Sequence, residues 1–180
     1  EGTIAMAERA VLSSTDGDIR VQAGTSLLSD TITAGQGSVA LIAGSTIADR
    51  DSDSLISASG LLLEAGTTIG TATNVLNTSV DTLSTASAGA QFLTETAGVT
   101  VGSVTVSVDR VGTDGSTTTV NKSQEDLTLT QEDLSTVPNE TPEDLAQENL
   151  TQEEQTQEDV PATPGALVLT VSTGNLVVAG

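Results

Sequence analysis

The chain contains no cysteine and no histidine among its 180 residues. Without cysteine there is neither a disulfide framework nor a thiolate metal site. Without histidine the chain lacks the commonest general base and the commonest transition-metal ligand. These absences argue against catalysis. We predict that the protein is not an enzyme and that it has no catalytic or cofactor-binding residues.

Aromatic side chains are nearly absent too, since Phe92 is the only Phe, Tyr or Trp in the chain. A rounded core of this size usually relies on aromatic residues, because each of them buries a large area. Here Ala, Val, Ile and Leu must build the core, and a narrow tube of thin aliphatic layers suits them better. No stretch approaches about 20 apolar residues, so we expect no transmembrane segment.

Positive charge is scarce, because 5 Lys and Arg stand against 25 Asp and Glu, a formal net charge of −20. Proteins bind nucleic acids and anionic membrane surfaces largely through Lys and Arg, which neutralise phosphate groups. The charge balance therefore argues against both as partners. It suits a soluble surface surrounded by cations.

Three segments, residues 17–24, 37–44 and 59–66, share one pattern. Each begins with a small residue and a spacer, continues with apolar residues at alternate positions, and ends in Ala-Gly. The closing Ala-Gly pairs lie 20 and 22 residues apart. Alternation with a period of two predicts strands rather than helices. A repeat of this length predicts stacked coils rather than a β-sandwich.

Aligned coil on coil, the alternating residues form inward columns between parallel strands about 4.8 Å apart. The expected columns are Ile19/Val39/Leu61, Val21/Leu41/Leu63 and Ala23/Ala43/Ala65. One coil cannot bury its own apolar face, so several must stack, and we predict about six. The predicted fold class is therefore all-β, a parallel β-helix (β-solenoid) with coils of about 20–22 residues and one acidic insertion.

The repeat divides the chain into three parts. Residues 1–120 are predicted to form solenoid coils, residues 121–163 an acidic low-complexity insertion, and residues 164–180 a continuation of the solenoid. The chain opens and closes inside apolar runs, with no initiator methionine and no signal peptide. We therefore expect the whole chain to be a fragment of a larger protein.

The insertion carries much of the negative charge, since residues 122–160 hold twelve of the 25 acidic residues and a single Lys. Thr141 and Pro142 resemble the start of a helix, which predicts a short helix over residues 142–155. Two roles stay open for the insertion. It is either a solvated excursion from one coil, which costs the fold little, or a binding module held by a rigid scaffold.

The Gly-x-Ile-x-Val-x-Ala-Gly coils are similar to the repeats of filamentous-haemagglutinin-like bacterial surface adhesins. Residues 76–83, 89–95 and 98–104 also resemble giant bacterial surface solenoids. The resemblance covers the predicted coils and departs from the family in its variable coil lengths and in the insertion. It implies a right-handed parallel β-helix, secretion to the bacterial cell surface, and a role in adhesion or as a stalk. It brings no catalytic residues with it.

Asp49, Asp51 and Asp53 have the alternating spacing of a calcium-binding loop. An EF-hand also needs Gly at its sixth position and Glu at its twelfth, where this chain has Ser54 and Gly60. That motif is therefore excluded. A looser Ca²⁺ site in a turn remains the metal candidate, and the simpler interpretation is a polar turn.

Ala40, Ile42 and Leu62 would face outward on the coil strands and form an apolar strip where a polar face is expected. Such a strip is a candidate lateral contact, covered either by the insertion or by another chain. The simpler interpretation is that scattered apolar residues are exposed, as on most proteins.

The function expected from these observations is architectural: a rigid stalk or scaffold segment of a large extracellular adhesin or filament. Its expected partners are neighbouring coils of the same parent chain, further copies in a self-assembly, and cell-surface glycans or proteins. The first alternative is a glycan- or cell-binding module that acts through the acidic insertion. The second is a polysaccharide-active β-helix enzyme, which would need acidic residues clustered on adjacent coils.

Overall fold

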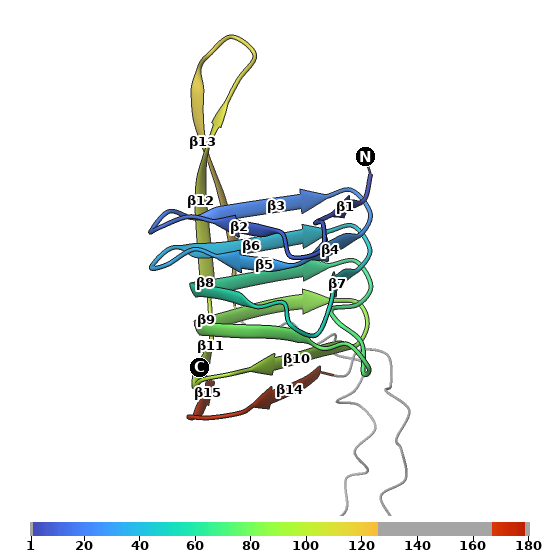
Figure 1. Cartoon of the computed structure of the whole chain (residues 1–180). Helices are drawn as coiled ribbons and strands as arrows, with labels where there is room; N and C mark the ends of the chain where they lie inside the picture. Colours follow the sequence, from blue (N-terminus) through green and yellow to red (C-terminus); the bar gives the residue numbers. More distant parts are fainter. Residues whose placement is uncertain (1, 126–166, 179–180) are drawn as a thin grey trace, which may run out of the picture.

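The computed structural model describes residues 2–125 and 167–178. These residues are all-β, with no helix, and their parallel coils of about 22 residues form a β-solenoid of about four turns (Figure 1). The predicted fold class is thus confirmed, with fewer turns than the six coils expected. The predicted helix over residues 142–155 and most of the acidic insertion lie outside the described residues.

The strands are short, as expected for a chain that turns a corner several times in each coil. Their bounds are β1 (Ile4–Ala5), β2 (Val11–Ser13), β3 (Ile19–Ala23), β4 (Leu27–Ser29), β5 (Thr31–Thr33), β6 (Ser38–Ala43), β7 (Ile47–Asp49), β8 (Ile56–Ala65), β9 (Leu76–Ser87), β10 (Gln91–Glu95), β11 (Val99–Val101), β12 (Val104–Val111), β13 (Thr117–Gln124), β14 (Leu167–Val171) and β15 (Leu176–Val178).

Parallel pairing between successive coils produces the faces of the solenoid. One face stacks β1, β4 and β7, and a second stacks β2, β5 and the first part of β8. A third stacks β3, β6 and the second part of β8. β9 pairs along both parts of β8, so it continues the second and third faces. The second face then runs through β10 to β14, and the third through β11 to β15.

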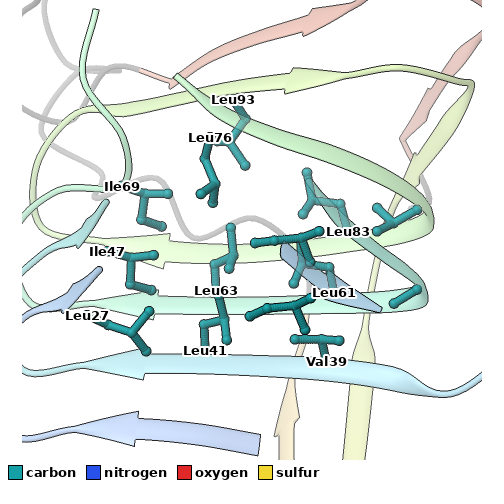
Figure 2. Close-up of a cluster of buried hydrophobic side chains, with 14 of the residues drawn as sticks. Leu27, Val39, Leu41, Ile47, Leu61, Leu63, Ile69, Leu76, Leu83 and Leu93 are labelled. Atoms are coloured by element: carbon teal, nitrogen blue, oxygen red, sulfur yellow. The ribbon is translucent and has the colours of Figure 1, made fainter. Parts of the chain in front are cut away.

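The inward columns lie in the predicted register. Ile19 pairs with Val39, Val39 with Leu61, and Leu61 with Leu83. The columns that begin at Val21 and Ala23 are paired in the same way. Figure 2 shows these aliphatic side chains lying layer upon layer inside the coils. A single hydrophobic cluster joins the layers from Ile19 to Val99.

Glycine occupies the corner after each inward alanine because the coils approach too closely for a side chain. A Cβ on Gly44 would lie 2.2 Å from the carbonyl oxygen of Gly24 in the adjacent coil. A Cβ on Gly66 would lie 2.1 Å from the carbonyl oxygen of Gly44. The repeated Ala-Gly pair therefore has two separate causes: alanine fills a narrow inward column, and glycine permits the close approach of the backbones.

The parallel coils do not run without a break to residue 120. β12 and β13 instead form an antiparallel hairpin in which Val104 pairs with Gln124 and Val111 with Thr117. Its turn is made locally, because Gly115 has φ of +80° and the Asp114 carboxylate accepts hydrogen bonds from the amide and hydroxyl of Ser116. In the described residues after the insertion, β14 pairs in parallel with β10, and β15 with β11.

Candidate functional site

The hairpin covers the outward apolar strip. Ala40 and Leu62 are fully buried and pack against Val104 and Val106 of β12. Figure 1 shows the hairpin running along the stacking direction, across the coil strands. The strip is therefore covered by β12, which lies within the residues expected to form coils, whereas the expected cover was the insertion or another chain. Only the partner strand β13 reaches into the first residues of the expected insertion. Ile42, the third residue of the strip, is 8% exposed and lies outside this cluster.

The hairpin has one apolar and one polar face because β12 alternates in the same way as a coil strand. Val104 and Val106 are buried against the sheet, whereas Thr105 and Ser107 between them are exposed. Thr105 forms a hydroxyl–hydroxyl hydrogen bond of 2.9 Å with Ser123 on β13. The hairpin therefore presents valines to the solenoid and hydroxyl groups to solvent.

Polar contacts hold both strands of the hairpin against the coils. The Asp18 carboxylate accepts from the amide of Ser38 at 2.8 Å through Oδ1, and from the amide of Ser107 at 2.7 Å through Oδ2. One side chain thus joins two coils and the hairpin. The other hairpin strand is held by an ion pair between Lys122 and Glu64.

We expect that Val106→Asp detaches the hairpin and leaves the coils folded. The substitution places an unpaired charge against Ala40 and Leu62, and a buried charge without a partner is strongly unfavourable. Hydrogen exchange should show loss of protection in β12 and β13, with β6 and β8 still protected. Thr105→Asp is the matched control, because it adds the same charge to the exposed face. Unchanged protection of the hairpin in Val106→Asp would contradict this packing.

A cleft of about 500 Å³ lies where the hairpin leaves the edge of the sheet. Its lining residues are Arg20, Gln22, Val108, Asp109, Arg110 and Val120. Arg20 donates through Nη2 to Oε1 of Gln22 at 2.9 Å, and its Nε is buried without a hydrogen-bond partner. The cleft therefore combines two cationic groups and one carboxylate with an aliphatic wall.

The three aspartates of the calcium candidate are not brought together as a site. Asp49 is buried at the end of β7, Asp51 is half-buried and Asp53 is exposed. Oδ1 of Asp51 already accepts from the amide of Asp53 at 3.0 Å and from the hydroxyl of Ser54 at 3.1 Å. In the described part of the chain, no group of three or more Asp or Glu residues is placed to hold a metal ion. This segment therefore forms a polar turn.

Burial raises the pKa of Asp49, with smaller opposing contributions from hydrogen bonds to Ser54 and Arg50. A raised pKa in the folded state means that stability is lost as pH rises above the ordinary value of 3.8. We therefore expect Asp49→Asn to raise the melting temperature at pH 7 by a few degrees. The gain should shrink as pH falls towards and below 3.8.

The control for this prediction is Asp53→Asn, which removes the same charge from an exposed position of the same loop. Melting temperatures of the three proteins between pH 3 and pH 8 provide the test. A stabilisation by Asp49→Asn that does not depend on pH would contradict a titration of Asp49. If Ca²⁺ raised the melting temperature of the unsubstituted chain but not that of either variant, the calcium site would be supported after all.

Comparison with known proteins found no matching family model, no similar curated protein and no similar solved structure. In the described residues no helix is long and apolar enough to cross a membrane.

Proposed function

We propose that the chain is a structural segment of a large secreted cell-surface adhesin or extracellular filament, and that it acts as a rigid stalk. The observation that carries the proposal is the unbroken register of the aliphatic columns. Ile19, Val39, Leu61 and Leu83 follow one another through four coils, joined by parallel backbone hydrogen bonds. A rod built in this way resists bending and stretching along its whole length.

The hairpin supports the same proposal because it runs across the coils. β12 contacts strands of four successive coils, β3, β6, β8 and β9. Separation of two coils would therefore also require separation from the hairpin. A brace in this direction is suited to an element that carries load between its ends.

The composition supports an extracellular location. A cysteine-free, strongly acidic chain of Ser, Thr and aliphatic residues is what the resemblance to filamentous-haemagglutinin-like adhesins leads us to expect at a bacterial surface. We propose that neighbouring coils of the parent protein are the immediate partners, and that glycans or proteins of other cells are bound elsewhere in the same protein.

The test separates a stalk from a recognition module. The full chain and a variant with residues 126–160 replaced by a Gly/Ser segment of equal length are screened against glycan arrays and intact cells. The replacement begins after Gln124 because Lys122 helps to hold the hairpin. The stalk role predicts no specific binding by either protein. Binding by the full chain that is lost in the variant would overturn the stalk role and make the acidic segment a recognition module.

A further inference from the structure

The second face of the solenoid carries an outward column of hydroxyl groups. Its members are Ser13, Thr33, Ser57, Ser79, Thr96 and Ser172. The first four pair with one another in register through β2, β5, β8 and β9. Thr96 continues the register, since its amide donates to the carbonyl of Thr78, and Ser172 follows with an amide that donates to Glu95. Each coil that crosses this face therefore places a serine or threonine at the same outward position.

A second outward column lies beside the first, two residues earlier in each coil, because alternate residues of a strand share one face. Its members are Val11, Thr31, Leu55, Asn77, Thr94 and Thr170. The last three are paired with one another in register through β9, β10 and β14. This column mixes polar with aliphatic side chains. The two columns together therefore present hydroxyl and methyl groups at regular intervals.

The hydroxyl groups of this face are open to solvent. Side chains of both columns are half-buried or exposed, and the hairpin packs on the third face, against Ala40 and Leu62. Four hydroxyl groups near the middle of the second face form no hydrogen bond within the described residues: those of Thr33, Ser57, Ser79 and Thr94. Further coils of a parent protein would lengthen these columns along the stack and would not cover them.

The composition of the two columns restricts the kind of partner that they fit. Neither column contains a charged or aromatic residue, in a chain whose formal net charge is −20. Protein interfaces are enriched in aromatic residues, Met and Arg, and small-molecule sites are concave and lined largely by apolar and aromatic side chains. The face therefore fits a neutral, extended partner that is bound through many weak hydrogen bonds.

The hydroxyl groups are spaced regularly in two directions. Successive coils lie about 4.8 Å apart, and alternate residues of a strand lie about 6.6 Å apart. Both distances are comparable with the spacings of water molecules on the surfaces of an ice crystal. Water held between neighbouring hydroxyl groups can hydrogen-bond to both of them. Such an array can therefore order a layer of water with spacings close to those of the ice lattice.

We propose that the second face of the solenoid binds ice. The layer of water ordered by the two columns joins the surface of the crystal, and the bound protein blocks further growth at that point. A charged side chain would hold its own hydration shell and disturb this layer, so the absence of charge from both columns suits the role. This inference adds an activity to the proposed stalk and does not depend on it.

Thermal hysteresis and the inhibition of ice recrystallisation measure ice binding directly. The full chain at millimolar concentration should shape growing ice crystals and hold the freezing point below the melting point. Ser57→Tyr places a bulky, uncharged side chain in the middle of the hydroxyl column and should reduce the hysteresis at least fivefold. Ser107→Tyr is the matched control, because it makes the same change on the exposed face of the hairpin and should keep the full activity.

Circular dichroism checks that the variants are folded, and tyrosine is well accepted in strands. Thr94→Tyr, in the second column, is a further variant with the same expected loss, so the test does not depend on the folding of Ser57→Tyr. A full chain that neither shapes ice nor shows hysteresis would overturn the proposal. Equal activity of folded Ser57→Tyr and Ser107→Tyr would overturn the assignment to this face.

The same proteins distinguish ice from a neutral polysaccharide. Retention of the full chain on microcrystalline cellulose, lost in Ser57→Tyr and without any shaping of ice, would overturn ice binding and assign the face to a glycan. Absence of ice binding leaves the stalk role standing, because that role rests on the inward columns. Glycan binding that depends on residues 126–160 would overturn the stalk role and leave ice binding untouched.

Discussion

Replacing Gly66 with alanine is expected to lower the free energy of unfolding by about 3 kcal/mol, as for a severely overpacked core site. The added Cβ would lie 2.1 Å from the carbonyl oxygen of Gly44 and 2.8 Å from its carbonyl carbon. Both atoms are backbone, so no side-chain rotation relieves the overlap. The coils must separate locally, which breaks parallel hydrogen bonds on either side of the corner.

Thermal unfolding followed by circular dichroism measures this effect. In a domain of this size each 1 kcal/mol shifts the melting temperature by roughly 2–4 °C, so a loss of about 6–12 °C is expected. Gly2→Ala is the matched control, because no atom lies within 4 Å of the Cβ that it adds. Equal melting temperatures for the two variants would contradict the close approach of the coils at Gly66.

The glycine corners show why the coils could be predicted from the sequence. The alternation of apolar and polar residues along a strand decides whether a side chain points into the solenoid or out of it. The spacing of the repeat decides which residues of successive coils stack on one another. The column Ile19/Val39/Leu61 therefore follows from spacing alone. Ala-Gly recurs because the geometry of the corner recurs. In a solenoid the same requirements for inward, outward and corner residues recur at a fixed interval. Each repeat of the sequence pattern therefore supports the same register independently.

The hairpin could not be recognised by the same reasoning. Val104, Val106 and Val108 alternate with polar residues just as a coil strand does, and the pattern does not reveal which strand is the partner. The signal that distinguishes them is local: Gly112 to Gly115 form a Gly-Thr-Asp-Gly turn sequence between two strands of eight residues each. The unusual outward apolar residues Ala40 and Leu62 did predict that something covers the sheet.

The calcium candidate failed for a physical reason that spacing does not reveal. Alternate residues of an extended strand line the same face but lie about 6.6 Å apart, so Asp49, Asp51 and Asp53 need a tight turn to converge on one ion. The turn that forms uses Asp51 as an acceptor for its own backbone and buries Asp49 separately. The three carboxylates therefore have different environments despite their regular spacing.

Glu95 was missed although its position in the sequence held the signal. Gln91, Leu93 and Glu95 share one phase of the alternation in β10, and Leu93 is plainly an inward residue. Glu95 must therefore face the core as well, and it is fully buried beneath Thr78 in the column that begins with Leu12 and Ile32. The column changes from aliphatic to polar in these last coils.

Glu95→Ala is expected to destabilise the chain by about 3 kcal/mol, because buried donors that lose their acceptor cost roughly 1–3 kcal/mol each. The Glu95 carboxylate accepts from the Thr78 hydroxyl at 2.8 Å, from the Val80 amide at 3.2 Å and from the Ala97 amide at 3.2 Å. In the described residues no Lys or Arg forms an ion pair with it. These hydrogen bonds are therefore what hold the carboxylate in the core.

Alanine leaves two amides and a hydroxyl without this acceptor and also leaves a cavity, so a loss of roughly 6–12 °C in melting temperature should accompany faster hydrogen exchange at Val80 and Ala97. Glu95→Gln keeps one carbonyl oxygen and should lose about half as much. A double-mutant cycle with Thr78→Val measures the coupling between the two side chains. If alanine were tolerated with both amides still protected, the carboxylate would not organise this layer. If the predicted loss is found, one buried carboxylate links two successive coils, because Thr78 and Val80 belong to β9, whereas Glu95 and Ala97 belong to the coil of β10.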